Sequence, residues 1–70
     1  MKIKFIKDCS IAVYVGGSDV IAPEIEEINE GDLYEVEHVI PTFKDIAEVQ
    51  FSNGDVSFID FDLFGIVGEE

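Results

Sequence analysis

The sequence has no tryptophan, one cysteine, one histidine and only four basic residues, and these scarcities exclude several kinds of site. A single cysteine, Cys9, cannot form a disulfide within the chain, and with His38 as the only histidine no zinc site of Cys and His ligands can form. One unpaired thiol is typical of a reducing compartment, so we expect a cytoplasmic protein. No apolar run approaches membrane-spanning length, so we expect no membrane association.

Positive charge is the scarcest property of the chain. Sixteen Asp and Glu residues face four lysines, which gives a formal net charge of −12. Three of the lysines lie within the first seven residues, at Lys2, Lys4 and Lys7. A phosphate backbone is bound by a footprint of Lys and Arg, and this chain has none to offer. We therefore expect no direct nucleic-acid binding, and we expect the partner to be another protein, basic in charge.

Alternating apolar and polar residues dominate what remains. The 70 residues suffice for one small domain, residues 1–70, with a modest core. Ala47, Val49 and Phe51 alternate with polar residues, the period-two pattern of a half-buried strand. Similar patterns predict five or six short strands, over residues 2–6, 11–15, 33–40, 46–52, 56–61 and 66–67. In a sheet, Lys2 and Lys4 would lie beside Glu35 and Glu37.

Turn residues separate these strands. Asn53-Gly54 predicts a hairpin with a type I′ turn, because both residues tolerate positive φ. Residues 60–64 predict a single 3₁₀ turn capped by an aspartate. The run 20–30 contains Pro23 and four glutamates without a regular apolar period, so we expect an irregular loop there.

The alternation also predicts which side chains form the core. We expect the interior to be lined by Val36, Val49, Phe51, Phe58 and Phe64. His38 falls on the same predicted face as Val36 and Ile40, which favours a core or edge histidine over a general base.

The order of these parts resembles a Src-homology-3-like barrel. The run 11–15 takes the place of the first strand, an acidic loop follows, and Gly31-Asp32 opens the second strand. The Asn-Gly hairpin, the 3₁₀ turn and a closing strand at Ile66-Val67 complete the layout. The resemblance implies an all-β fold, a small five- to six-stranded, partly open SH3-like barrel with one 3₁₀ turn. Closing a sheet in this way also protects its edges.

Two further comparisons qualify the resemblance. Barrels of this family that bind proline-rich ligands use several aromatics, including a tryptophan at the start of the third strand, and this chain has no tryptophan. The segment Phe-Ser-Asn-Gly-Asp-Val at 51–56 also resembles the hairpin of short bacterial and phage single-domain proteins with no assigned activity. That second likeness bears on the fold and implies no function.

No residue set in the sequence indicates catalysis. Asp55, Asp60 and Asp62 suggest the start of a calcium loop, but Phe64 stands where another oxygen ligand is needed. One histidine and one cysteine do not make a nucleophilic pair without an orienting group. We therefore expect no metal, no cofactor and no enzymatic activity.

Two functions remain after these exclusions. The favoured one is a non-enzymatic, acidic protein-binding module of phage or mobile-element origin. Its expected contact residues are aromatics and acids on loops, namely Tyr14, Glu24, Glu26, Glu27, Phe43 and Phe61. The alternative is a nucleic-acid mimic that inhibits a basic DNA-binding protein, which requires the carboxylates to gather on one face. Either a monomer or a homodimer paired through an edge strand is compatible with the pattern, and the first strand is the expected free edge.

Overall fold

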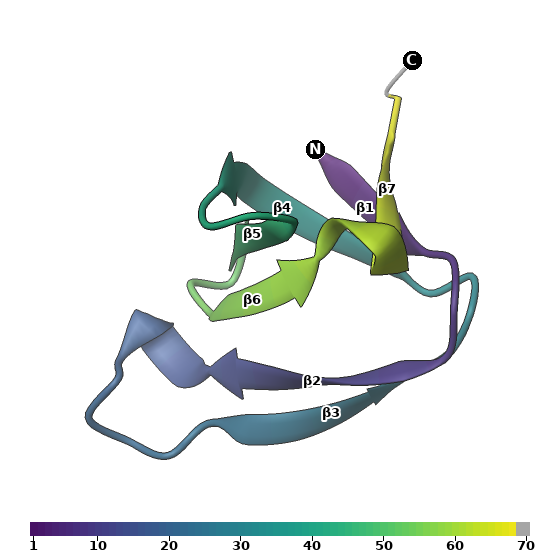
Figure 1. Cartoon of the computed structure of the whole chain (residues 1–70). Coiled ribbons are helices and arrows are strands. Elements are labelled where there is room, and N and C mark those ends of the chain that lie inside the picture. The colour runs from purple at the N-terminus through teal and green to yellow at the C-terminus, as the bar shows by residue number, and fades with distance from the viewer. Residues whose placement is uncertain (69–70) are drawn as a thin grey trace.

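The chain folds as a single antiparallel sheet. A computed structural model describes residues 1–68, and this part contains seven strands, two 3₁₀ turns and no α-helix (Figure 1). The elements are β1 (Lys2–Phe5), β2 (Cys9–Tyr14), η1 (Val15–Gly17), β3 (Glu24–Ile28), β4 (Leu33–Pro41), β5 (Ile46–Phe51), β6 (Val56–Asp60), η2 (Phe61–Leu63) and β7 (Phe64–Val67). The all-β prediction is confirmed, whereas the predicted count of five or six strands is too low.

The sheet curls into a half-barrel. Its strand order is β3-β2-β6-β5-β4-β1-β7, and all neighbours are antiparallel. β1 pairs with β4 on one side and β7 on the other, so the edges are β3 and β7, and the expectation of a free edge on β1 is wrong. Lys2 lies opposite Glu35, and its Nζ is 3.8 Å from the carboxylate, which confirms that part of the prediction. Lys4 lies opposite Leu33, so the predicted place of Lys4 beside these glutamates is wrong.

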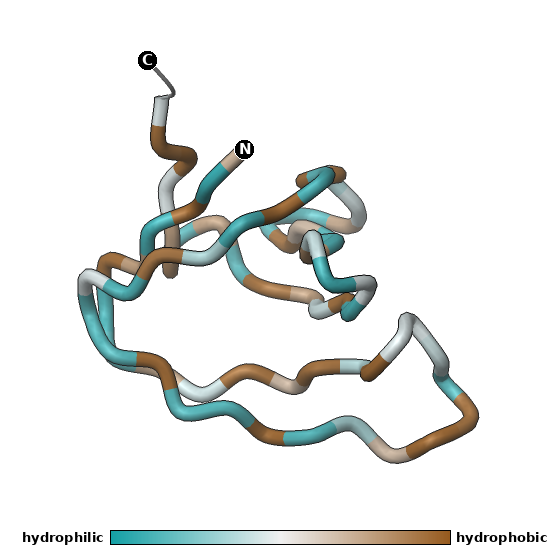
Figure 2. The backbone as a smooth tube through the Cα atoms, turned by 180° about the vertical axis from the view of Figure 1, so that it is seen from behind, coloured by the Kyte–Doolittle hydropathy of each residue, from teal (hydrophilic) through white to brown (hydrophobic). Residues whose placement is uncertain are grey.

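The missing strand is β3. The sequence favoured an irregular loop over residues 20–30, but residues 24–28 pair with β2 over five positions. The pattern was hidden because both inward-facing residues in the first part of β3, Glu24 and Glu26, are charged. Figure 2 shows the resulting hairpin, in which apolar (brown) and hydrophilic (teal) stretches alternate.

One side of the curled sheet holds the core. Its buried residues are Ile3, Phe5, Ile11, Val13, Ile28, Val36, Ala47, Val49, Phe51, Ile59 and Phe64. Four of the five predicted core residues are among them, and the fifth, Phe58, is 52% exposed. Phe58 lies opposite Glu48 on the outer face, because its neighbours Ser57 and Ile59 take the inward positions of β6.

A β-bulge in β4 changes which side chains face inward. Val36 pairs with Phe51, but the next pair is His38 with Gln50, so Glu37 is an extra residue. Beyond the bulge Val39 is half-buried, while His38 and Ile40 are exposed. The prediction that His38 shares an apolar face with Val36 is therefore wrong.

The β5–β6 hairpin forms where expected but with a different turn. Within this turn only Gly54 has a positive φ, of 97°, whereas Asn53 does not, so the turn is not type I′. The Gly54 N–H donates to the Phe51 carbonyl at 3.0 Å, and the Phe51 N–H donates to the Asp55 carbonyl at 2.8 Å. This is a three-residue loop closed by a left-handed glycine, the next commonest hairpin connection.

The predicted 3₁₀ turn is present as η2, but without the predicted cap. The Asp60 side chain makes no capping hydrogen bond. Instead, the Phe61 N–H donates to the Asp45 carbonyl at 2.7 Å, which attaches η2 to the β4–β5 loop.

The inward and outward positions of β6 predict opposite responses to mutation. Ile59→Val removes a methylene group from the packed core and should lower the free energy of unfolding by about 1 kcal/mol. Phe58→Leu, at an exposed position, should change it by no more than about 0.5 kcal/mol. Urea unfolding followed by circular dichroism measures both, and equal losses would contradict the assignment of Phe58 to the outer face.

The glycine of the hairpin turn gives a second prediction. Gly54→Ala places a Cβ at φ 97°, which L-residues rarely adopt, and should destabilise the protein by about 1–2 kcal/mol. Gly65→Ala is the matched control, because Gly65 lies in β7 with open space around an added Cβ and its φ is not positive. Thermal unfolding of both variants distinguishes backbone strain from a general cost of replacing glycine.

Candidate functional site

The β2–β3 hairpin directs two carboxylates toward the interior side of the sheet. Glu26 pairs with Ile11, and Glu24 pairs with Val13. Residues directly opposite one another on paired strands share a face, and Ile11 and Val13 are both buried. Glu24 and Glu26 therefore project from the hairpin on the side that faces the other strands, and both remain exposed to solvent.

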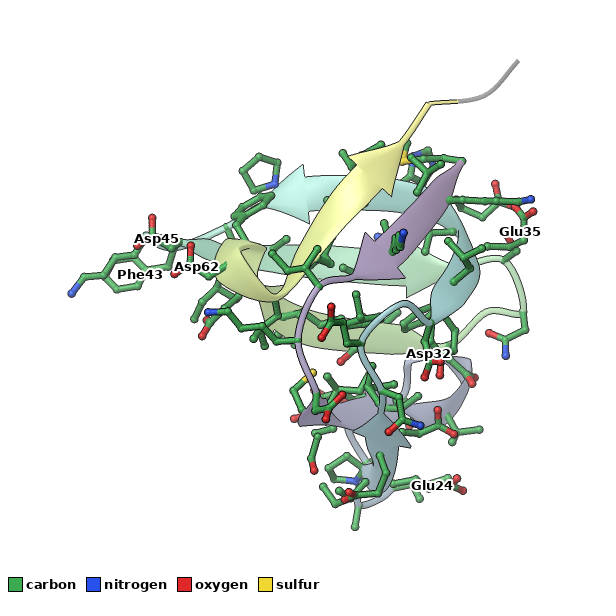
Figure 3. The ribbon with its side chains drawn as sticks, turned by 90° about the vertical axis from the view of Figure 1, so that its right-hand side faces the viewer. Glu24, Asp32, Glu35, Phe43, Asp45 and Asp62 are labelled. Carbon is green, nitrogen blue, oxygen red and sulfur yellow. The ribbon has the colours of Figure 1, made fainter. Side chains whose placement is uncertain are left out.

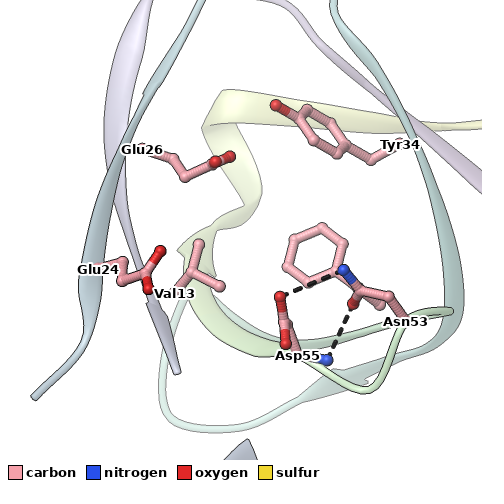
Figure 4. A pocket seen from close by; sticks show the side chains of 7 residues that line it. Val13, Glu24, Glu26, Tyr34, Asn53 and Asp55 are labelled. Carbon is pink, nitrogen blue, oxygen red and sulfur yellow. Dashed lines mark hydrogen bonds between the residues drawn. The ribbon is translucent and has the colours of Figure 1, made fainter. Parts of the chain in front are cut away.

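An aromatic and polar wall lies across from these carboxylates. It consists of Tyr34 from β4, Phe51 from β5, and Asn53 and Asp55 from the β5–β6 turn (Figure 4). The space between the two walls, with Val13 at its side, has a volume of about 210 Å³. We call this space the acidic cleft, lined by Val13, Glu24, Glu26, Tyr34, Phe51, Asn53 and Asp55.

Asp55 holds the two walls of the acidic cleft together. Its Oδ1 accepts the Gly16 N–H at 3.0 Å, which joins the end of the β2–β3 hairpin to the β5–β6 turn. Its Oδ2 accepts the Asn53 Nδ2–H at 3.2 Å, and its own N–H donates to Asn53 Oδ1 at 3.0 Å. Both oxygens of the Asp55 carboxylate therefore accept hydrogen bonds from within the protein.

Glu24 and Glu26, in contrast, are available to a ligand. Within residues 1–68, neither carboxylate makes a hydrogen bond or an ion pair, and no lysine lines the acidic cleft. The Tyr34 ring is fixed edge-on between Phe5 and Phe51, at centroid distances of 5.6 and 5.8 Å. Two uncompensated carboxylates beside an aromatic wall suit the ammonium or guanidinium group of a basic side chain.

The electrostatics of the acidic cleft are reflected in Tyr34. Burial raises the pKa of its phenol above 10.0, and the nearby charges of Glu26 and Asp32 raise it further. Tyr34 is therefore a neutral hydrogen-bond donor at physiological pH.

The other predicted contact residues lie elsewhere. Glu27 is on the opposite face of β3, where it accepts the Ser10 hydroxyl at 2.9 Å. Tyr14 is on the outer face of the sheet, with its ring 6.1 Å from that of Phe58. Phe43 is 72% exposed in the β4–β5 loop, and Phe61 stacks on Phe64 at 5.8 Å. The structure brings only Glu24 and Glu26 of the predicted set into one cavity.

Sequence reasoning missed the aromatic and polar wall of the acidic cleft. Phe51 was predicted to face inward, but its position and that of Tyr34 across from Glu26 depend on β3 being a strand. The signal that would have found it is the i, i+2 spacing of Glu24, Glu26 and Ile28.

Three other features were sought among residues 1–68: a metal site, a reactive thiol and a membrane-spanning helix. They contain no group of three or more His, Cys, Asp or Glu side chains that could hold a metal ion. Burial and then the charge of Asp8 raise the pKa of the Cys9 thiol, which disfavours the reactive thiolate. No helix among residues 1–68 is both long and apolar enough to cross a membrane.

Comparison with known proteins found no relative: no family model, curated protein or solved structure matches this chain.

The position of Tyr34 predicts a pH dependence. In a Tyr14→Phe background, Tyr34 is the only tyrosine, and its phenolate absorbance should rise only above pH 10. Because the folded-state pKa is raised, the stabilisation it reflects is complete below the unfolded value of about 10 and is lost as the pH rises through the folded value. Glu26→Gln should lower the Tyr34 pKa, and an unchanged titration would show that Glu26 does not face the ring.

Proposed function

We propose that this protein is a non-enzymatic, acidic binding module that docks on a basic protein through the acidic cleft. The observation that carries the proposal is the pair of carboxylates, Glu24 and Glu26, turned inward by the β2–β3 register and left without a counter-charge. A strand that directs two charges toward a core side gains nothing in packing from them. A cationic side chain inserted between Glu26 and Tyr34 would supply the missing charge and contact the ring.

The long-range field supports the same class of partner. With a net charge of −12, the molecule attracts cationic surfaces and repels other acidic proteins. Such steering raises the rate of association and makes it sensitive to salt. We propose that this encounter takes place in the cytoplasm, where the unpaired Cys9 thiol stays reduced.

The distribution of acids favours a docking module over a nucleic-acid mimic. Figure 3 labels carboxylates from separate parts of the fold: Glu24 is at one end of the molecule, Asp45 and Asp62 lie beside Phe43 at one side, and Glu35 is at the opposite side. A mimic of a phosphate backbone needs its charges in a row on one surface.

We propose further that the half-barrel is a Src-homology-3-like barrel, with β1 rather than β2 as its first strand. In this reading β1 meets the closing strand β7 and the start of β4, and the β2–β3 hairpin takes the place of the acidic loop. The β5–β6 hairpin and η2 follow in the order of that family. The acidic cleft then lies between the long first loop and the body of the barrel.

Charge removal in the acidic cleft tests the proposed function. Binding of fluorescein-labelled hexalysine, followed by anisotropy at low ionic strength, should weaken about tenfold in the Glu24→Gln/Glu26→Gln double variant, because two charge-assisted contacts are lost.

The matched control changes the net charge equally at a distance from the acidic cleft. Glu37→Gln/Asp62→Asn alters two exposed carboxylates outside it and should weaken binding by about threefold or less, through the long-range field alone. Equal effects of the two double variants would mean that hexalysine senses only net charge, and the acidic cleft would then not be the binding site.

A further inference from the structure

The outer face of the sheet carries a row of apolar side chains that none of the other residues in 1–68 covers. Ile25 pairs with Ala12, Phe58 pairs with Glu48, and Glu48 pairs with Ile40. Ile25, Phe58 and Ile40 are 66%, 52% and 41% exposed. An antiparallel sheet normally presents polar side chains on its solvent face, so this row is an exception to the pattern.

A hollow interrupts this face at the level of β2 and β6. Its volume is about 380 Å³, and we call it the outer hollow, lined by Tyr14, Gly17, Asp19, Glu48, Val56 and Phe58. The rings of Tyr14 and Phe58 meet edge to face, with centroids 6.1 Å apart. Gly17 contributes no side chain, and a Cβ there would lie 3.5 Å from the Val56 methyl group, which leaves the hollow open at that corner.

Of the two carboxylates that line the outer hollow, Glu48 is the one whose position is held by a side-chain hydrogen bond. It is half-buried, and its Oε2 accepts the Gln50 Nε2–H at 2.7 Å. The hydrogen bond restricts the carboxylate, while its Oε1 makes no hydrogen bond within residues 1–68. No lysine lines the outer hollow, so its charge is uncompensated there.

These features favour a partner segment in which a positively charged side chain stands between apolar residues. A second copy of this chain fits poorly, because joining two outer faces would bring Glu48 and Asp19 of both copies together. An arginine suits the hollow better than a lysine, since a planar guanidinium stacks on aromatic rings and donates to a carboxylate at the same time. Apolar residues beside that arginine would cover Phe58 and Ile40.

We infer that the outer hollow is a second docking surface, which binds an arginine flanked by apolar residues on a basic protein partner. The guanidinium contacts the Tyr14 and Phe58 rings and donates to Glu48, and the flanking residues lie along the exposed row. The inference rests on the proposed binding function for its partner class, but it concerns the face opposite the acidic cleft and is tested separately.

Nuclear magnetic resonance titration with defined peptides tests this surface. The probe is acetyl-Gly-Leu-Arg-Leu-Gly-amide, added to the ¹⁵N-labelled full chain. Backbone amide shifts should concentrate at Tyr14, Gly17, Glu48 and Phe58. The same peptide with citrulline, a neutral arginine isostere, should bind about threefold more weakly, and so should a peptide with glycine in place of both leucines.

Variants then assign the contacts to side chains. Glu48→Gln and Phe58→Leu should each weaken arginine-peptide binding about threefold, whereas Glu37→Gln, an exposed charge outside the hollow, should leave it within experimental error. Phe58→Leu keeps an apolar group at an exposed position, so a loss of binding does not reflect unfolding.

Three results would overturn the inference. They are equal binding of the citrulline peptide, shifts confined to the acidic cleft, and concentration-dependent dimerisation through this face in sedimentation velocity.

The outcomes separate the two surfaces. Hexalysine binding that depends on Glu24 and Glu26, without peptide shifts at the outer hollow, contradicts only this inference. Shifts at the outer hollow, with hexalysine insensitive to those glutamates, contradict only the acidic cleft.

Discussion

Backbone pairing on both sides of β1 is the constraint on which the rest of the half-barrel depends. The strand joins the beginning, middle and end of the chain, because it lies between β4 and β7. Its inward residues, Ile3 and Phe5, have no exposed surface, and the Phe5 carbonyl accepts the Gly31 N–H at 2.7 Å. The pairing of β1 with β4 sets Tyr34 opposite Ile3 and against the Phe5 ring, so the aromatic wall of the acidic cleft depends on the position of β1.

The carboxylates are placed so that their mutual repulsion lowers the free energy of unfolding only slightly. Most carboxylates lie on exposed positions, where water screens their mutual repulsion. Glu24 and Glu26 are exposed as well, but they lie on the inward side of β3, where they face the acidic cleft (Figure 4). An edge strand tolerates them because β2 alone pairs with it, and charge at that edge also discourages pairing with other strands.

The strands whose apolar residues follow a period of two were predicted correctly. The predictions failed at the bulge in β4 and in β3, where charged residues take inward positions. Val36, Val49, Phe51 and Phe64 were placed correctly in the core because alternation fixes the face of each strand. His38 was misplaced because a bulge is not visible in the alternation that precedes it. The site was half predicted: Glu24 and Glu26 were chosen for their charge, but the wall opposite them required the pairing of β3, which its glutamates concealed.

The attachment of the β2–β3 hairpin has a consequence for motion. β2 pairs with β3 at five positions but with β6 at only two, Val13 with Ser57 and Tyr14 with Val56. The Ser57 hydroxyl, which donates to the Ala12 carbonyl at 2.7 Å, and the Asp55 contact to Gly16 add the remaining polar links. Because this junction is short, we expect it to open at a lower free energy than the whole domain unfolds, so that amide hydrogens of β2 and β3 exchange as one unit, ahead of those of β4 and β5. Any ligand that spans both walls would slow that exchange and stiffen the hairpin, so its affinity is linked to the loss of this breathing motion.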